Sequence, residues 1–359
     1  MWRMICALLV SMSLIHGCTK KEPQSITNEG PTNPVASVAL EDGQTLSGPY
    51  TSGNLAVYLV HGPDRTGGRR YLTLAEAMEQ NKLIVHETGD VNTLAIECVS
   101  DDIVFIPAGS VVKGGKQDRT LGSDVIITRD DGKMPIDAFC VEQGRWRQRG
   151  GETVAHFASA PSMVAGRELK IAANANIPGL NKQGEVWENV ARAQVRLSTA
   201  LNADVRDEAS ASSFQLTMEN QKLRAAMETR QRGLVSVIDG RDDVVGWVYA
   251  INGQPVSGNV YASPDLFRKL WPRRRGPAAG EARAGGSGPP PQPAGEIVET
   301  PAPALEDAAA LLATARTEGA QREVNGRTTV NTYDSSDTVH LETEDRANGY
   351  ILHRSVLRK

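Results

Sequence analysis

Short strand-like runs separated by turn residues dominate residues 46–149, and this pattern restricts the possible fold more than any other feature. The runs are, in chain order, residues 55–60, 83–86, 94–99, 103–106, 125–128 and 136–141. The single helix predicted among them lies within residues 71–80, with Thr73 as its N-cap. Closely spaced strands with so little helix are typical of a sandwich or a barrel-like sheet. We therefore expect residues 46–150 to form a β-rich part.

Helical spacing of apolar residues becomes more frequent after Gly150. Two helices are expected at residues 186–201 and 213–232, and two strands at residues 234–238 and 244–251. Asn252 and Gly253 are typical of a tight hairpin turn after the second strand. A short helix at residues 266–271 follows. Residues 151–271 are thus predicted to mix helices and strands, and the fold class is α+β.

The composition changes again at Pro272. Residues 272–303 hold three consecutive arginines, many Gly and Ala residues and a Pro-Pro-Pro run. Such a segment buries too little apolar surface to offset the entropy lost on ordering, so we expect a disordered insertion there. Residues 304–359 are predicted to form a helix followed by closing strands. These segments are residues 305–317, 327–333, 339–342 and 350–357.

Residues 1–17 have the features of a secretory signal peptide. Arg3 supplies a positive start, and residues 4–15 form an apolar run shorter than the roughly 20 residues that span a membrane. The run leads into a sequence that resembles a bacterial lipobox, Leu14-Ile15-His16-Gly17-Cys18. We expect cleavage before Cys18 and lipid attachment to it, with residues 18–45 forming a lipidated N-terminus and flexible tether.

This interpretation places the protein outside the cytoplasm. It predicts an exported, lipid-anchored protein of the bacterial cell envelope, with the lipid bilayer as a partner. The alternative is an ordinary secretory signal followed by a chance cysteine. The net charge of −4 gives no sign of a nucleic-acid partner.

Two cysteines remain in the folded part once Cys6 is assigned to the signal peptide and Cys18 to lipidation. Cys98 and Cys140 both fall in strand-like runs. In an oxidising compartment they could form a disulfide bond, or they could be two small buried side chains. Neither has the CxxC spacing of a structural zinc site.

Metal ligands and cofactors are not indicated by the remaining residues. His340, Glu342 and Glu344 fall on one face of a predicted strand and could hold a metal ion. A solvated polar face is the more usual explanation of this pattern. We therefore predict no metal site and name no cofactor.

Two polar loops within residues 111–146 hold the groups best suited to an anionic ligand. Adjacent glycines in the first loop let backbone N–H groups converge on one point, and Lys116 and Arg119 add positive charge. In the second loop, Arg145 and Trp146 can close over a flat ligand. The candidate ligand-binding residues are Gly114, Gly115, Lys116, Gln117, Asp118, Arg119, Arg145 and Trp146. The alternative is a glycine hairpin with solvated charges beside a strand end held by a surface ion pair.

Catalysis is not established by any motif in the chain. No nucleophile signature such as GxSxG is present, and no set of Ser, His and Asp can be identified. Asp118 and Glu142 are the candidates for a general acid or base if the protein is an enzyme.

Five sequence blocks occur in an order typical of one bacterial family. They are residues 114–119, 140–146, 183–187, 245–253 and 263–267. Together they resemble the ARG and rhodanese-phosphatase-superfamily-associated protein family, in which ARG stands for ADP-ribosylglycohydrolase. The resemblance covers residues 53–271 and, more weakly, residues 327–359.

The resemblance implies a link to NAD-derived or ADP-ribose metabolism, without an established activity. For this chain it favours an anionic ligand, with nucleotide-like and ADP-ribose-like compounds as candidates. An enzyme of NAD or ADP-ribose metabolism is one alternative, and a structural surface protein without a small-molecule site is another. The family pattern also leads us to expect an amphipathic helix after Trp271, where this chain instead has Arg-Arg-Arg-Gly-Pro.

Overall fold

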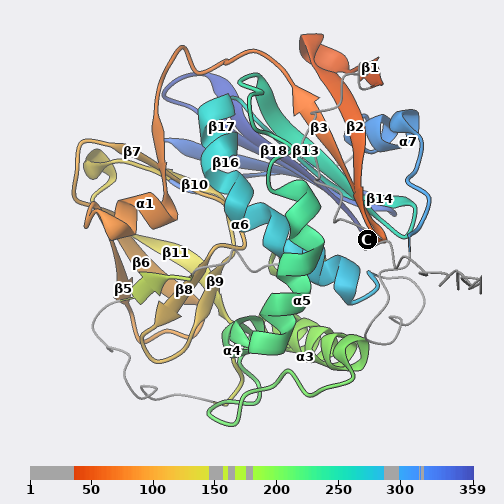
Figure 1. Ribbon diagram of the computed structural model, residues 1–359. Coiled ribbons are helices and arrows are strands. Elements are labelled where there is room, and N and C mark those ends of the chain that lie inside the picture. The colour runs from red at the N-terminus through yellow and green to blue at the C-terminus, as the bar shows by residue number, and fades with distance from the viewer. Residues whose placement is uncertain are drawn as a thin grey trace, which may run out of the picture. The chain divides into compact units, whose positions relative to one another are not determined.

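Nine strands from three separate regions of the chain form the largest sheet of the computed structural model (Figure 1). Their order is β1-β2-β3-β13-β14-β18-β17-β16-β15, and every neighbouring pair is antiparallel. The strands are β1 Ser37–Ala39, β2 Thr45–Ser52, β3 Leu55–His61, β13 Val244–Ile251, β14 Gln254–Tyr261, β15 Gly319–Glu323, β16 Thr328–Asp334, β17 Thr338–Asp345 and β18 Tyr350–Arg358. The structure describes residues 36–144, 157–160, 166–174, 181–286, 299–314, 316 and 319–359.

Two smaller sheets come from the segment between β3 and the first long helix. The six-stranded sheet has the order β12-β8-β9-β11-β6-β5, and the three-stranded sheet has the order β10-β7-β4. The strands are β4 Tyr71–Thr73, β5 Leu83–Glu87, β6 Thr93–Cys98, β7 Ile103–Ile106, β8 Val111–Gly114, β9 Arg119–Leu121, β10 Val125–Ile127, β11 Lys133–Cys140 and β12 Phe157–Ser159. The edge strands β12 and β5 contact each other, so the six-stranded sheet is nearly closed and barrel-like, as expected.

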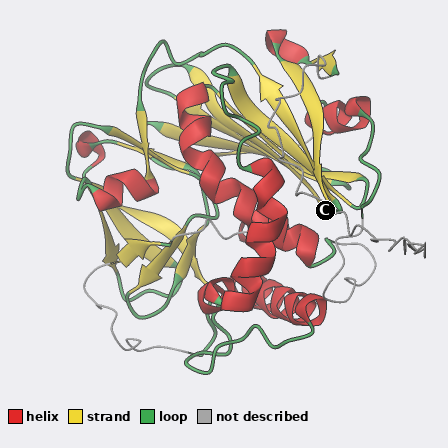
Figure 2. Ribbon diagram, viewed as in Figure 1, coloured by secondary structure: helices red, strands yellow, loops and turns green. Residues whose placement is uncertain are grey.

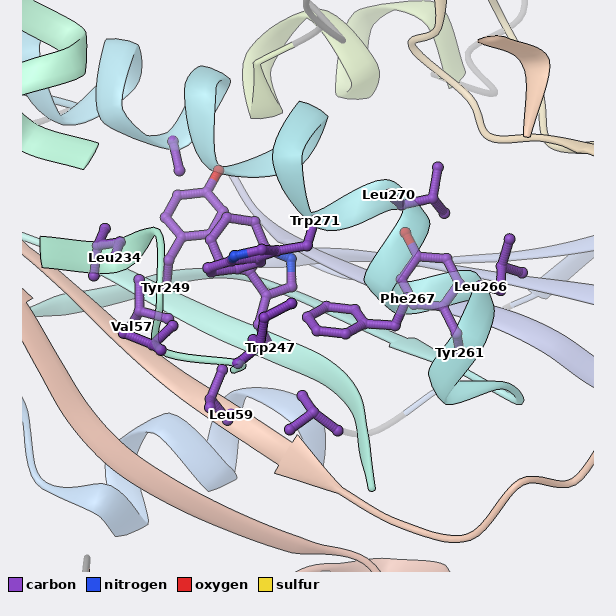
Figure 3. Close-up of a cluster of buried hydrophobic side chains, with 14 of the residues drawn as sticks. Val57, Leu59, Leu234, Trp247, Tyr249, Tyr261, Leu266, Phe267, Leu270 and Trp271 are labelled. Atoms are coloured by element: carbon purple, nitrogen blue, oxygen red, sulfur yellow. The ribbon is translucent and has the colours of Figure 1, made fainter. Parts of the chain in front are cut away.

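The helices cover both faces of the nine-stranded sheet. They are α1 Leu74–Glu79, α2 Arg167–Asn174, α3 Lys182–Leu201, α4 Phe214–Glu219, α5 Gln221–Gln231, α6 Pro264–Arg283 and α7 Leu305–Leu312. On one face, Trp247 of β13 packs edge-on against Trp271 of α6, with ring centroids 5.2 Å apart (Figure 3). On the other face, Ala308 and Leu311 of α7 pack in a cluster that includes Val248. Trp247 and Val248 point to opposite faces because successive strand residues alternate.

Several elements lie where local sequence signals place them. Thr73 caps α1 in a capping box: its side chain accepts a hydrogen bond from the Glu76 N–H, and the Glu76 side chain accepts one from the Thr73 N–H. Asn252 and Gly253 have φ values of 52° and 78°, which is the left-handed geometry of a tight hairpin turn. The closing strands are confirmed as β16, β17 and β18. Figure 2 shows strands gathered into sheets with helices grouped beside them, which confirms the α+β class.

Two predicted elements in the middle of the chain are wrong. The helix predicted at residues 213–232 is divided at Asn220, whose side chain accepts hydrogen bonds from the N–H groups of Lys222 and Leu223 and begins α5. Residues 234–238 form a short 3-10 turn and further turns instead of a strand. Their apolar side chains Leu234, Val237 and Ile238 are buried in the core below α6. A short apolar run does not distinguish a strand from a buried turn, because both need apolar side chains.

The prediction of disorder from Pro272 onward is wrong for the first part of that segment. The helix expected to end at Trp271 continues as α6 to Arg283, although it contains Pro272 and Pro277. Each internal proline costs a helix about 3 kcal/mol in isolation. Packing of α6 on β13 and burial of residues such as Ala278 and Ala279 outweigh that local cost. Residues 287–298 lie outside the described residues.

The boundary of the predicted N-terminal tether is also wrong. Residues 37–39 form β1, which pairs with β2 at the edge of the nine-stranded sheet, and Val38 and Leu40 pack against the cluster beneath α7. These backbone hydrogen bonds and apolar contacts order a segment that its polar composition does not distinguish from a linker. The predicted signal peptide, the lipidation site Cys18 and the tether up to Val35 lie outside the described residues. No helix within the described ranges is long and apolar enough to cross a membrane.

Candidate functional site

The predicted glycine-rich loop is a tight hairpin between β8 and β9. Gly114 and Gly115 have φ values of 118° and 57°, and the Gly114 N–H donates a 3.0 Å hydrogen bond to Oδ1 of Asp118. A Cβ atom added to Gly115 would lie 2.3 Å from Cζ of Phe157. Both glycines therefore have a structural explanation, because the hairpin requires left-handed backbone and close packing on β12.

The charged residues of this loop form a buried network with the second predicted loop. Arg119 donates from Nη1 to Oε1 of Gln117 (3.2 Å), and Gln117 donates from Nε2 to the Glu142 carbonyl oxygen (3.1 Å). Glu87 accepts a hydrogen bond from the Lys116 N–H and lies 3.9 Å from Nη2 of Arg119. Asp118, Arg119 and Glu142 are fully buried. The structure thus connects the first loop to Glu142, and the charges that it brings together are buried rather than solvated.

The remaining residues either have structural partners or lie outside the described residues. Arg145 and Trp146 lie outside the described residues. Glu87 belongs to the buried network, while His86 beside it points to the other strand face and pairs with Glu97 at 2.9 Å. Gln183 of α3 explains one family block, because its side chain makes hydrogen bonds of 2.8 and 2.9 Å to the backbone N–H and carbonyl of Cys140.

Cys98 and Cys140 are both buried and are not bonded to each other. The interpretation as two small buried side chains is therefore the one that the structure supports. Burial raises the pKa of the Cys140 thiol to about 11, since a thiolate is poorly solvated there. A thiol with such a pKa is unreactive at neutral pH.

The strand face of His340, Glu342 and Glu344 is not the solvated face that the sequence predicts. His340 and Glu342 are buried on β17, on the side of the sheet that α7 covers. Oε1 of Glu342 forms ion pairs with Nε of Arg316 and Nε of Arg354, each at 3.3 Å. A register shift between Thr343 and Glu344 separates the third residue from the other two. No group of three or more candidate metal ligands occurs within the part of the chain that the structure describes.

A cavity between α2, α6 and the nine-stranded sheet is the strongest candidate site. Its empty volume is about 350 Å³, and its walls include charged, amide, hydroxyl and aromatic groups. Strand alternation explains the sheet wall, because Ser257 and Asn259 of β14 and Trp247 and Tyr249 of β13 share one face. Arg167 and Lys170 of α2 both line the cavity because residues three apart lie on the same side of a helix. Figure 3 shows Trp247 and Tyr249 lying between the sheet and α6.

One of the three cations at this cavity is neutralised by the protein. Arg167 donates from Nε to Oε1 of Glu281 at 2.9 Å. The other carboxylate oxygen of Glu281 accepts a hydrogen bond from the Tyr249 hydroxyl at 2.8 Å. Glu281 thus pairs with Arg167, and no ion pair joins it to Lys170 or Arg274 in the described residues.

Lys170 and Arg274 are the other two cations, and neither forms an ion pair with a carboxylate in the described ranges. Arg274 is 4% exposed, and its Nε and Nη2 atoms are buried without a hydrogen-bond partner there. Its guanidinium lies 5.9 Å from the centroid of the Tyr261 ring. Lys170 is 9% exposed, and burial together with the charge of Arg274 lowers its pKa well below the ordinary value of 10.5. Arg274 therefore contributes uncompensated positive charge and unused hydrogen-bond donors to the cavity, while the lowered pKa of Lys170 favours its neutral amine.

A second polar network supports one wall of the cavity. Oδ2 of Asp124 lies 2.6 Å from Nδ1 of His353, and Nε2 of His353 lies 3.2 Å from Oδ1 of Asn259. Burial alone would raise the pKa of Asp124, but His353 and the hydrogen bonds from Thr343 and the Ala108 N–H lower it to about 2. Asn259 is thereby held in a fixed position beside Arg274.

Sequence reasoning did not find Lys170 or Arg274. Lys170 lies in a segment with no motif, and Arg274 lies in the triple-arginine run that was assigned to a disordered insertion. The start of α6 is signalled by the N-cap Ser263 followed by Pro264. Apolar positions beyond Trp271 are the signal that could have extended the predicted helix to include Arg274. Only folding brings these two cations together, since they lie on different helices.

The fold defines an α+β protein, with a cavity lined by Arg167, Lys170 and Arg274 beside the nine-stranded sheet. A family model described as the ARG and Rhodanese-Phosphatase-superfamily-associated Protein domain matches residues 43–357, which is most of the chain. The protein therefore belongs to this family, as the sequence blocks predict. Comparison with curated proteins and comparison with solved structures each gave no match.

Proposed function

We propose that this protein is a lipid-anchored domain of the bacterial cell envelope that binds a small anionic molecule in the cavity between α2, α6 and the sheet. The observation that carries the binding proposal is the buried guanidinium of Arg274, whose Nε and Nη2 have no hydrogen-bond partner in the described residues. Lys170 faces the same cavity. An anion in the cavity would supply the missing acceptors and the missing negative charge.

Burying the charge of Arg274 is unfavourable unless a negative charge lies nearby. A buried cation without a counter-charge is disfavoured by several kcal/mol, because it loses its hydration. Proteins tolerate such groups where a ligand restores the balance, and perturbed ionisable groups accordingly concentrate at functional sites. A guanidinium presents two parallel N–H groups, which match the two oxygens of a carboxylate or phosphate. The ligand class is therefore a carboxylate or a phosphate.

The size of the cavity restricts the ligand further. The cavity is small, because its empty volume of about 350 Å³ includes space that is open to solvent. This favours a small anion, or one charged group of a larger molecule, over a complete dinucleotide. The aromatic side chains of Trp247 and Tyr249 form an apolar wall for the remainder of the ligand.

Titration calorimetry with matched variants tests the binding proposal. The ligands are inorganic phosphate, short carboxylates, ADP-ribose and NAD, and the variants are Arg274→Gln and Arg268→Gln. Arg268 lies on the same helix, but it is exposed and pairs with Asp242 at the surface. We expect one of the ligands to bind to the unmodified protein and to Arg268→Gln, and its affinity to fall at least about tenfold in Arg274→Gln, a loss of about 1.4 kcal/mol. Equal affinities for all three proteins would contradict the cavity as the site.

The same experiment distinguishes the cavity from the predicted loops. Arg119→Lys keeps the positive charge at the loop network but removes the guanidinium fork. If this variant loses binding while Arg274→Gln retains it, the anion site is at residues 114–119 instead. Conversion of ADP-ribose or NAD by the purified protein, abolished in Glu142→Gln, would establish the alternative of an enzyme that uses the loops.

Membrane attachment has its own test. We expect the full-length protein to fractionate with membranes and to incorporate a labelled fatty acid, and Cys18→Ser to lose both properties. Cys6→Ser is the control, because this residue lies in the predicted signal peptide and leaves with it. Membrane association that persists in Cys18→Ser would contradict lipidation at that residue.

A further inference from the structure

Lys170 is the only lysine among the described residues that line the cavity. Several other lysines are paired with carboxylates. Lys82, Lys113 and Lys269 lie 2.9, 2.7 and 2.9 Å from the carboxylates of Asp102, Glu219 and Asp265. A carboxylate at that distance stabilises the ammonium form. Lys170 has no such carboxylate within ion-pair distance in the part of the chain that the structure describes. Lys133, Lys182 and Lys222 form no such ion pair within the described residues either, but they do not line the cavity, so Lys170 is the amine that a ligand there would meet.

Three neighbouring charges influence whether the Lys170 amine is protonated or neutral. Arg274 disfavours the ammonium ion, while Asp124 and Glu281 favour it. These two carboxylates are already engaged, Asp124 with His353 and Glu281 with Arg167. Burial is the largest influence, and burial and Arg274 together outweigh the carboxylates, so the neutral amine is favoured. A neutral lysine amine in a partly closed cavity beside another cation is the arrangement that favours nucleophilic attack on a carbonyl group.

We propose that Lys170 forms an imine with a small carbonyl compound whose carboxylate or phosphate group is held by Arg274. This inference rests on the proposed function, because the anionic group of the substrate must bind in the same cavity. Lys170 and Arg274 line one cavity of about 350 Å³, so the carbonyl and the anionic group must be close in the substrate. A 2-oxo acid has this chemistry.

The reaction is a condensation without oxidation or reduction. The lone pair of the Lys170 Nζ atom attacks the carbonyl carbon, a C–N bond forms, and the C=O π electrons move to oxygen. Proton transfer from nitrogen to oxygen produces a carbinolamine. Loss of the hydroxyl group with a second nitrogen proton releases one water molecule and leaves the imine. Protonation of the imine by solvent creates a positive charge near the anionic group of the substrate, which stabilises it.

Reductive trapping with pyruvate and borohydride tests this inference. Hydride reduces an imine to a secondary amine, and peptide mapping by mass spectrometry then locates the modified lysine. We expect modification of Lys170 at least about tenfold faster than of Lys182, because its pKa is lowered well below the ordinary value and it lines the cavity that would hold the carboxylate of pyruvate. Lys182 is the internal control: its pKa is also lowered by partial burial, but it does not line the cavity. Modification of several lysines at similar rates, or none at Lys170, would overturn the inference.

Competition experiments separate this inference from the binding proposal. Lactate has the carboxylate of pyruvate without its ketone, so it should compete for Arg274 and slow the trapping, and Arg274→Gln should slow it as well. If lactate and pyruvate bind in calorimetry but no adduct forms, imine formation is wrong and anion binding stands. If Lys170 is trapped at the same rate in Arg274→Gln and in the presence of lactate, the anion-anchoring role is wrong. The adduct is mapped on the unmodified protein, so the test requires no substitution of Lys170.

Discussion

Asp124 and His353 are joined by a 2.6 Å hydrogen bond although 229 residues separate them along the chain. Asp124 immediately precedes β10 of the three-stranded sheet, and His353 lies on β18 of the nine-stranded sheet. The contact therefore links two sheets and, through Asn259, supports the wall of the cavity. Tyr261 stacks on the His353 ring at a centroid distance of 4.4 Å, which restricts the imidazole further.

Removal of this contact should lower the free energy of unfolding substantially. Asp124→Ala leaves His353 and Thr343 without their acceptor, and each buried donor left unsatisfied costs about 1–3 kcal/mol. Denaturant unfolding measures the change. Asp204→Ala is the control, because Asp204 pairs with Arg206 at the surface and such pairs contribute roughly 0–1 kcal/mol. Equal losses in the two variants would contradict the structural role of Asp124.

Acidification should destabilise the protein between pH 6.5 and about 4 because of His340. Burial, and to a lesser extent the charge of Arg316, lowers the pKa of His340 from 6.5 to about 4. In this window the unfolded chain binds a proton that the folded protein does not, so stability is complete above pH 6.5 and falls as the pH falls. The loss due to this one residue is at most about 3 kcal/mol. Unfolding curves at several pH values should show a weaker dependence for His340→Gln, and an unchanged dependence would contradict this explanation.

Gly115→Ala should destabilise the hairpin that contains the predicted ligand loop. The new Cβ atom would lie 2.3 Å from the Phe157 ring, and the backbone φ of 57° is itself unfavourable for alanine. Gly89→Ala separates these effects, because Gly89 has a φ of 85° but no atom within 4 Å of its Cβ position. We expect a loss of about 1 kcal/mol for Gly89→Ala and a loss larger by about 1–3 kcal/mol for Gly115→Ala, measured by denaturant unfolding.

Arg119→Ala should also destabilise the protein, because the loop network is buried. The substitution would remove the partner of Gln117 and the positive charge beside Glu87. A loss of about 3–5 kcal/mol is expected from breaking such a buried charged contact. Lys133→Ala, at an exposed position of β11, should change stability by less than about 0.5 kcal/mol. A negligible effect of Arg119→Ala, measured in the same unfolding experiment, would instead favour an open ligand-binding loop.

Lys170→Met should stabilise the folded protein. The lowered pKa of Lys170 means that the unfolded chain binds a proton more readily at neutral pH, so the lysine weakens folding there. Replacing a buried ionic group with an apolar side chain of similar size is often neutral or stabilising, by about 1–4 kcal/mol. Thermal unfolding of the two proteins without ligand tests the sign. A large decrease in stability would show that Lys170 is retained for structure rather than for ligand chemistry.

The amino-acid sequence by itself determined the elements whose signals are local. The Thr73 capping box, the Asn252-Gly253 turn and the closing strands depend on interactions between residues close in the chain. The order of the family blocks likewise identified the family that the match over residues 43–357 confirms. The sequence placed Gln117 and Glu142 in two polar loops but did not predict the hydrogen bond that joins them.

Only the tertiary structure decided which polar groups are buried and which of them meet. Packing on β13 extends α6 through Pro272 and Pro277 to Arg283, although local propensity opposes a helix there. That extension places Arg274 opposite Lys170, two cations on separate helices whose proximity no local pattern encodes. The reason is that burial and charge pairing depend on contacts between distant segments, whereas turns and caps depend on neighbours in the chain.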